Sequence, residues 1–118
     1  MPPDPSSHLP LRPVDLYLLL ALAREEQHGY GLVQAIEEGT GGLVRLDPGN
    51  LYRVIKRLLA DGLVAEAERR AAPGAGNERR RYYRLTTLGR RVLAADLRRL
   101  QALVTSPAVR TIVQGWAT

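Results

Sequence analysis

The most regular pattern of apolar and polar positions lies between residues 47 and 62. Leu51, Ile55 and Leu58 recur at the spacing of one helix face, Leu59 lies beside them, and Val54 lies at their margin. The pattern predicts a helix about four turns long, with one buried face and one basic face. The basic face consists of Asn50, Arg53, Lys56 and Arg57.

The two ends of this helix carry residues with known capping roles. Asp47 can accept a hydrogen bond as the N-cap, and Pro48 suits the first helical position. Gly62 can adopt the left-handed conformation that follows a helix. The helix is therefore predicted to begin at Pro48 and to end just before Gly62.

Two further segments predict a β-hairpin. Residues 63–68 alternate apolar and charged side chains after Val64, and residues 81–85 are rich in strand-forming types. The Pro- and Gly-rich residues 71–77 form its tip. Tyr82 and Tyr83 point to opposite faces of their strand, so one is expected in the core and the other near a phosphate. The sequence does not distinguish the two.

Six arginines flank the hairpin tip. Their guanidinium groups converge on one small surface and repel one another unless an anion lies among them, and a phosphate backbone is such an anion. The six are Arg69, Arg70, Arg79, Arg80, Arg81 and Arg84.

Two helices are predicted before the basic one. Residues 16–22 would form a helix that is apolar on all sides and is therefore buried on more than one side. Residues 29–38 predict a supporting helix that stops at the glycine-rich residues 39–42. Residues 43–46 are long enough for a short strand, which we expect as the third strand of the sheet.

A long helix is predicted to begin at the threonine at 86 or 87, either of which can cap it. Its apolar stripe has spacings of four, three and four, as in a short coiled-coil seam. This stripe packs either on the chain's own first helix or on a second copy of the chain. The stripe consists of Leu93, Leu97, Leu100 and Val104.

These elements predict a mainly α-helical fold with a small β-hairpin wing (α+β), a winged helix-turn-helix with a C-terminal dimerisation helix. Five of the eight prolines lie in residues 1–13, and residues 1–10 are expected to form a disordered arm. Residues 11–86 are expected to form the winged-helix domain. Residues 87–118 are expected to form the dimerisation helix and a short terminal helix.

Charge is unevenly distributed along the chain. Residues 1–50 hold three arginines and seven acids, a net charge of −4, while residues 51–118 hold fourteen basic residues and five acids, a net charge of +9. This polarity favours a nucleic-acid partner and binding that weakens steeply in salt. Single-stranded RNA is usually read by stacked aromatic side chains, and the chain has no Phe and one Trp, so duplex DNA fits better.

The basic helix offers suitable donors for DNA. Asn and Arg side chains can pair with adenine and guanine edges in the major groove, and Lys can contact a phosphate. A solvated basic face on an ordinary helix has the same composition, and the arginine-rich hairpin is what favours the DNA interpretation.

Cysteine is absent, which excludes disulfides and thiolate zinc sites. The apolar run at residues 16–23 is shorter than the ~20 residues that a membrane helix needs. With no secretory signal in the first residues, we expect a cytoplasmic protein without a membrane partner.

An enzyme is not predicted. Histidines occur only at positions 8 and 28, and four of the twelve carboxylates form adjacent pairs, at 25–26 and 37–38, that would not face each other on a helix. His28 and Glu25 offer two of the three or four ligands of a metal site, and a helix-start role suits His28 better. We therefore predict no cofactor and no metal.

Three motifs lie in the order and at the separations of a known family. They are residues 28–32 (His-Gly-Tyr-Gly-Leu), residues 48–52 (Pro-Gly-Asn-Leu-Tyr) with Leu58 and residues 61–63, and residues 81–89 (Arg-Tyr-Tyr-Arg-Leu-Thr-Thr-Leu-Gly). Over residues 11–100 the chain resembles the PadR-type (phenolic-acid-responsive) transcriptional regulators, in their small single-domain form. These are winged-helix repressors of bacteria.

The resemblance implies roles for individual positions. The helix after Asp47 corresponds to the recognition helix, Tyr30 and Tyr52 to positions that reach phosphates, and the hairpin to the wing. The DNA-contacting residues predicted on both grounds are Tyr30, Asn50, Tyr52, Arg53, Lys56, Arg57, Arg79, Arg80, Arg81 and Tyr83.

In the family, the first and C-terminal helices build a two-fold homodimer. Such a dimer would place two recognition helices about one DNA turn, ~34 Å, apart and would bind a roughly palindromic operator. The residues predicted to form this interface are Leu16, Leu19, Leu93, Leu97, Leu100 and Val104.

Family members also respond to small aromatic or drug-like effectors, some of which bind in an apolar cavity at the dimer interface. Tyr17 and Trp116 are the aromatic candidates here. Alternatively, Trp116 pins the C-terminus to the dimer.

The predicted function is that of a ligand-responsive dimeric repressor that binds a palindromic operator in double-stranded DNA. The alternative is a winged-helix module that binds protein, or binds nucleic acid without sequence preference, and has no inducer.

Overall fold

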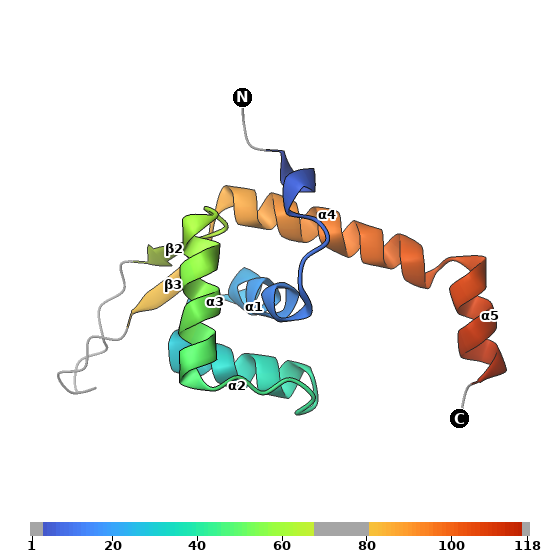
Figure 1. Cartoon of the computed structure of the whole chain (residues 1–118), viewed down its shortest axis with the longest axis horizontal. Helices are drawn as coiled ribbons and strands as arrows, with labels where there is room; N and C mark the ends of the chain where they lie inside the picture. Colours follow the sequence, from blue (N-terminus) through green and yellow to red (C-terminus); the bar gives the residue numbers. More distant parts are fainter. Residues whose placement is uncertain (1–3, 68–80, 117–118) are drawn as a thin grey trace.

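The computed structural model describes residues 4–67 and 81–116, which form a mainly helical chain with a small sheet (Figure 1). This is the predicted fold class. Among the described residues, no helix is both long and apolar enough to cross a membrane. The elements in chain order are η1 (Pro5–His8), α1 (Pro13–Arg24), β1 (Gln27–His28), α2 (Gly29–Gly39), α3 (Pro48–Ala60), β2 (Val64–Ala67), β3 (Tyr82–Leu85), α4 (Thr87–Val104) and α5 (Pro107–Gly115).

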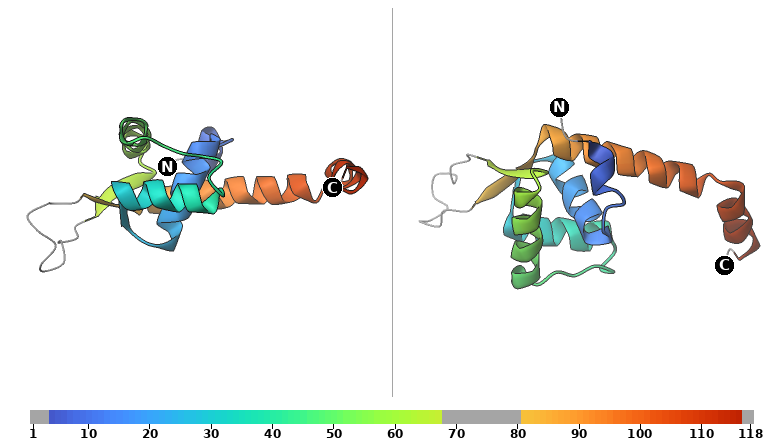
Figure 2. Two further views of the ribbon diagram at one scale, coloured as in Figure 1. Left: turned by 90° about the horizontal axis from the view of Figure 1, so that it is seen from below. Right: turned by 45° about the horizontal axis from the view of Figure 1, so that its top comes forward.

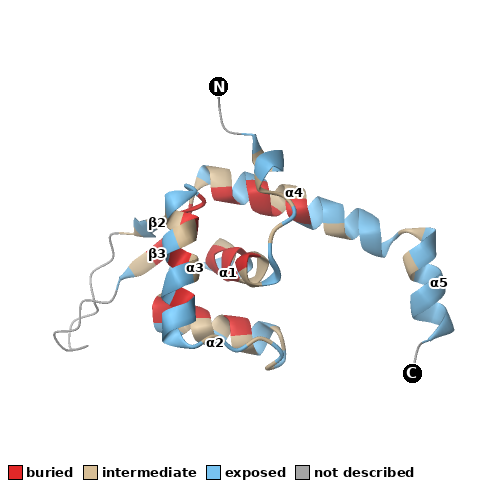
Figure 3. Cartoon of the chain, viewed as in Figure 1, coloured by how far each residue is buried: buried red, intermediate tan, exposed pale blue. Residues whose placement is uncertain are grey.

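The core surrounds α1, which α2, α4 and the sheet cover from several sides (Figures 1 and 3). Leu18 and Leu19 of α1 have no exposed surface, and Leu22 has almost none. This confirms that the apolar helix is buried on more than one side. The core also includes Leu32, Ile36, Leu51, Ile55, Leu58, Leu63, Val64, Tyr83, Leu85, Val92 and Leu93.

The predicted capping of α3 is confirmed. The Asn50 amide donates a hydrogen bond of 2.8 Å to Oδ1 of Asp47, and Pro48 occupies the first helical turn. Gly62, just past the end of α3, has a φ of 75°, in the left-handed region that favours glycine. The helix therefore spans the 13 residues between these two signals.

The sheet has the strand order β1-β3-β2, and both pairs are antiparallel. The β2–β3 hairpin is as predicted, with Val64 opposite Leu85. The predicted third strand at residues 43–46 is wrong: this segment connects α2 to α3 without pairing, and β1 is the third strand. Because β1 and β2 occupy both edges of β3, no edge of that strand is left for residues 43–46.

The N-terminal segment differs from the disordered arm that we expected for residues 1–10. Within its described part, the Asp4 carboxylate accepts hydrogen bonds from the Ser6 amide and hydroxyl and so caps the short helix η1. These hydrogen bonds hold the pKa of Asp4 below its ordinary value. The helix η1 packs on α4, and Leu9 reaches the core.

Only the first half of α4 belongs to the core of the chain. Thr86 caps this helix by accepting the Gly89 amide at 2.9 Å, as predicted, and Val92 and Leu93 are buried. From Leu97 onward the helix extends away from the other elements and carries α5 at its end (Figures 1 and 2). The radius of gyration, 16.6 Å, therefore exceeds the ~13.5 Å typical of a compact chain of this length.

Candidate nucleic-acid interface

The exposed face of α3 presents two cations to solvent. Arg53 and Lys56 lie on the side opposite the buried Leu51 and Ile55, so the fold of the helix fixes which way they point. Neither forms an ion pair with any side chain in the described part of the protein. These two predicted positions are therefore available to an anionic partner.

Asn50 lies in the first turn of the same face and is exposed. Its side-chain amide donates to Oδ2 of Asp47 over 2.8 Å, in addition to the backbone hydrogen bond of the cap. The two hydrogen bonds fix the direction of the Asn50 side chain. A contact between Asn50 and a base edge would have to form beside Asp47 or replace this side-chain hydrogen bond.

The structure places Arg57 differently from the sequence prediction. Its guanidinium donates two hydrogen bonds of 2.8 Å to the two carboxylate oxygens of Asp15, which is buried at the start of α1. Hydrogen bonding to Asp15 raises the pKa of Arg57 above its ordinary value. Arg57 therefore joins α3 to α1, and we no longer count it among the DNA-contacting residues.

Two exposed tyrosines lie where α2 begins. The Nδ1 atom of His28 accepts the Gly31 amide at 3.1 Å and caps α2, which confirms the helix-start role of His28. Tyr30 follows, 66% exposed, with its ring stacked on that of His28 at 6.4 Å. Tyr52 of α3 is 55% exposed, and its hydroxyl lies near Gly29. The Tyr52 hydroxyl thus lies beside the start of α2, where Tyr30 is exposed.

The prediction that Tyr83 contacts DNA is wrong. Tyr83 is only 3% exposed and belongs to the core, and its burial raises the pKa of its hydroxyl. Tyr82 is the half-exposed member of the pair, and its ring meets the His28 ring edge-on at 5.5 Å. Since strand neighbours point to opposite faces, the alternation itself was predicted correctly and the choice between the two tyrosines was not.

The described base of the wing carries two exposed arginines. Arg81 lies 3.8 Å from Glu66 across the hairpin, an exposed pair of little energetic weight. Arg84 is exposed on the outer face of β3. The other predicted wing cations, Arg69, Arg70, Arg79 and Arg80, lie outside the described residues.

Two of the predicted dimer residues are internal to the chain. Leu19 is fully buried in α1, and Leu93 is 5% exposed on α4, so both serve the core of a single chain rather than an interface. The sequence could not show whether these leucines pack in the core of one chain or in a dimer interface, because the same apolar helix face suits either contact. Leu97 and Val104 are exposed, and Leu16 and Leu100 are half-buried.

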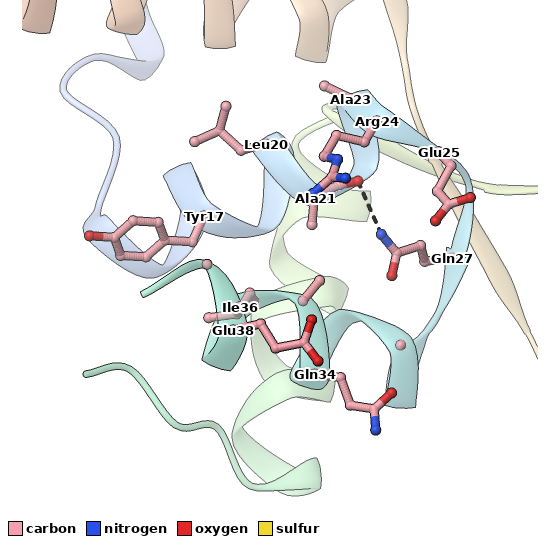
Figure 4. Close-up of a pocket in the computed structure, with 13 residues that line it drawn as sticks. Tyr17, Leu20, Ala21, Ala23, Arg24, Glu25, Gln27, Gln34, Ile36 and Glu38 are labelled. Carbon is pink, nitrogen blue, oxygen red and sulfur yellow. Dashed lines mark hydrogen bonds between the residues drawn. The ribbon is translucent and has the colours of Figure 1, made fainter. Parts of the chain in front are cut away.

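The two predicted effector residues do not meet within one chain. Tyr17 lines a groove between α1 and α2 (Figure 4). Trp116, 80% exposed, follows α5 at the far end of the molecule (Figure 1). In the part of the chain that the structure covers, no three His, Asp or Glu side chains are grouped as a metal site.

A three-stranded wing sheet and an exposed cationic helix, both built around a buried α1, define the class of winged-helix transcriptional regulators. The model of the transcriptional regulator PadR-like family matches residues 18–95. The chain is 39% identical over 90 residues to the transcriptional regulator Rv3488 of Mycobacterium tuberculosis. The alignment covers 76% of this chain and 78% of that protein. The protein therefore belongs to the PadR-like family, whose members are transcriptional regulators rather than enzymes.

Solved structures agree with this assignment. RosR of H. salinarum is 25% identical with a TM-score of 0.66, and the alignment covers 92% of this chain and 91% of that one. PadR of Bacillus subtilis, solved in complex with operator DNA, is 25% identical with a TM-score of 0.61. That alignment covers 75% of this chain and 48% of the Bacillus protein.

Proposed function

We propose that this protein is a dimeric repressor that binds operator DNA by inserting α3 into the major groove. The observation that carries the proposal is the exposed face of α3, where Arg53 and Lys56 have no ion-pair partner among the described residues. A helix of 13 residues is ~20 Å long, and its diameter suits a groove about 12 Å wide. Arg53 would read a guanine edge, and Lys56 would contact a phosphate.

Residues on both sides of α3 would hold the DNA backbone. Tyr30 and Tyr52 can donate their hydroxyl protons to phosphate oxygens, and Arg81 and Arg84 can pair with phosphates beside the wing. These contacts carry no sequence information, but they would fix the position of α3 in the groove. The Bacillus subtilis relative in complex with operator DNA supports the same partner for this chain.

The outer half of α4 supports the dimer. Leu97, Leu103 and Val104 expose apolar surface on a helix that has left the core of its own chain. A second copy would bury this surface, and the two-fold axis between them would make the operator a palindrome with half-sites ~34 Å apart. We place this DNA-bound dimer in the cytoplasm.

An effector would act by changing the distance or angle between the two copies of α3. We keep Tyr17 and Trp116 as the residues that would contact a small aromatic or drug-like molecule. Because they lie far apart in one chain, a site that contains both would have to form between two copies.

The substitution Arg53→Ala tests the position of α3 directly. If Arg53 holds a guanine, the loss of this contact costs about 1–3 kcal/mol of binding free energy and relaxes the preference at one base pair. Binding would be measured by fluorescence anisotropy on a set of duplexes that differ at single positions.

Arg98→Ala is the matched control, because it removes one exposed positive charge from α4 rather than from α3. It should change binding little and leave base preference unaltered. Equal effects of the two substitutions, or no change of preference with Arg53→Ala, would contradict the proposed reading of the groove by α3.

A further inference from the structure

A groove of about 750 Å³ lies between α1 and α2 (Figure 4). Ala21 and Ile36, both almost fully buried, line it from the core side, and Tyr17 and Leu20 line it from α1. Charged groups of Arg24, Glu25 and Glu38 also border it. It thus combines apolar lining residues with a charged border, as a site for an amphipathic helix does.

The helix α5 has such an apolar face, and no element in the described part of the chain buries it. Val109, Ile112, Val113 and Trp116 follow one another at the i, i+3, i+4, i+7 spacing of a single helical stripe. None of the residues of α5 is buried, and Ile112 and Trp116 are 61% and 80% exposed. An apolar stripe of this size in water indicates a contact that a single chain does not make.

The chain cannot place its own α5 in its own groove while α4 stays intact. The 18 residues of α4 form a continuous helix ~27 Å long that holds α5 at the far end of the molecule (Figures 1 and 2). From there α5 turns toward the side of α4 on which α1 and α2 lie (Figure 1). The orientation suits a groove of the same kind on a neighbouring molecule.

The two surfaces have opposite charges. The helix α5 holds one arginine, Arg110, and no acid. Residues 24–39, which border the groove, hold one arginine and four glutamates. A second copy of the chain therefore offers this groove an apolar stripe and, in Arg110, a positive charge for a border that has more glutamates than arginines.

A two-fold dimer built on α4 would bring the two surfaces together. If the two α4 helices cross antiparallel near Leu100, Val104 of one copy lies level with residue 96 of the other, so α5 of the first copy begins beside the buried half of the second copy's α4. The arm formed by the outer half of α4 and by α5 would then extend along the first two helices of the partner.

We propose that α5 of each copy docks in the α1–α2 groove of the other, with its apolar stripe facing Leu20 and Ile36. Arg110 lies near the glutamates of the groove border, and Trp116 lies near the partner's Tyr17. This inference rests on the proposed dimer and names its second contact surface. Exchange of the two arms ties each winged-helix domain to the other at a site away from the α4 stripe.

Disulfide trapping tests the contact, because the chain contains no cysteine of its own. One full-length chain would carry Ile112→Cys, and a second, of different mass through a tag, would carry Ala35→Cys in the groove. After mixing and mild oxidation, the docked arm gives a disulfide between the two kinds of chain. A mixture with Ala60→Cys on exposed α3 is the matched control and should give little of the mixed species.

Absence of the mixed disulfide, or equal yields with Ala35→Cys and Ala60→Cys, would overturn the inference. Light scattering on the unsubstituted protein separates this from a failure of the proposed dimer. If the protein is dimeric but gives no specific disulfide, the proposed α4 dimer stands and the docked arm is contradicted. If the protein is monomeric at all concentrations, both the α4 dimer and the docked arm are contradicted.

The fluorescence of Trp116, the one tryptophan of the chain, provides a second readout without cysteines. In the dimer its emission should be blue-shifted, as for a ring removed from water, and dilution to monomer should shift it to the red. Ala35→Glu should cause the same red shift while the dimer mass stays constant, and Ala60→Glu should not. A dimer whose tryptophan emits as a fully solvated ring would contradict the docked arm.

Discussion

Two side chains, Asp15 and Arg57, fix α3 to α1. Asp15 is buried in the first turn of α1, where the helix dipole favours its negative charge, and both of its oxygens accept hydrogen bonds from Arg57. Within the described residues, this salt bridge links α3 to α1. It therefore adds a polar contact to the apolar packing of α3 in the core.

The two halves of this ion pair are not equivalent. The Asp15 side chain is 5% exposed and that of Arg57 35%, so only the guanidinium can be hydrated when its partner is removed. We expect Arg57→Ala, which leaves a buried carboxylate unpaired, to reduce the free energy of unfolding by about 3–5 kcal/mol. Asp15→Ala should cost less, about 1–3 kcal/mol, because water and salt screen the remaining cation.

Chemical denaturation of both variants and of the double variant measures these changes. The double variant should be less destabilised than the sum of the two single changes, because neither charge is then left alone. If Asp15→Ala were the more destabilising single change, the burial of this pair would have been assigned to the wrong partner.

Single residues also show where prediction from the sequence stops. Periodicity correctly separated Leu51 and Ile55 from Arg53 and Lys56, because these positions lie on opposite sides of α3. Arg57 lies on the flank of the helix, and its side chain points toward Asp15, a carboxylate 42 residues away in sequence. No local pattern contains that information.

At the scale of elements, the wing and α4 are closely packed where they meet. The Thr86 amide donates to the Leu63 carbonyl over 3.1 Å, and the Thr86 hydroxyl donates to the Gly62 carbonyl over 2.6 Å. The first turn of α4 thus lies against the turn that follows α3. Gly89 faces the Leu63 carbonyl at this contact, and a Cβ atom there would overlap it.

Gly89→Ala should therefore destabilise the protein, although alanine favours helices more than glycine does. The overlap is with backbone, so α4 would have to move away from the hairpin, at a cost of about 1–3 kcal/mol or more. Gly39→Ala is the control, because nothing lies within 4 Å of the added Cβ at the end of α2. Thermal unfolding would compare the two, and equal melting temperatures would rule out the close packing at Gly89.

Element boundaries were predictable where the chain carries capping residues. Asp47 and Thr86 begin α3 and α4 as predicted, because each cap is a local hydrogen bond. The strand β1 was missed because two residues are too few for a periodic signal, and its pairing depends on the position of β3. The helix η1 was missed because its packing on α4 is a contact between distant segments.

For the whole molecule, the proposed dimer depends on the outer half of α4. Val104→Asp should weaken the dimer by at least tenfold without destabilising the monomer, because Val104 is exposed in the single chain and a charge would enter the apolar interface. Sedimentation equilibrium measures the dimer dissociation constant. Ala102→Asp, exposed on this half of α4 but away from the side of Leu97 and Val104, is the control for added charge. A dimer that tolerated Val104→Asp would have to use another surface.

Binding of the unaltered protein to DNA decides whether it recognises an operator sequence. Fluorescence anisotropy would compare a labelled duplex from upstream of the protein's own gene with a scrambled duplex across a salt series. We predict preference for the native duplex and a loss of at least about 1,000-fold in affinity between 50 and 200 mM salt, as for six or more phosphate contacts per dimer. Equal affinity for both duplexes would contradict sequence-specific recognition at this site, and no binding at low salt would contradict the DNA-binding function itself.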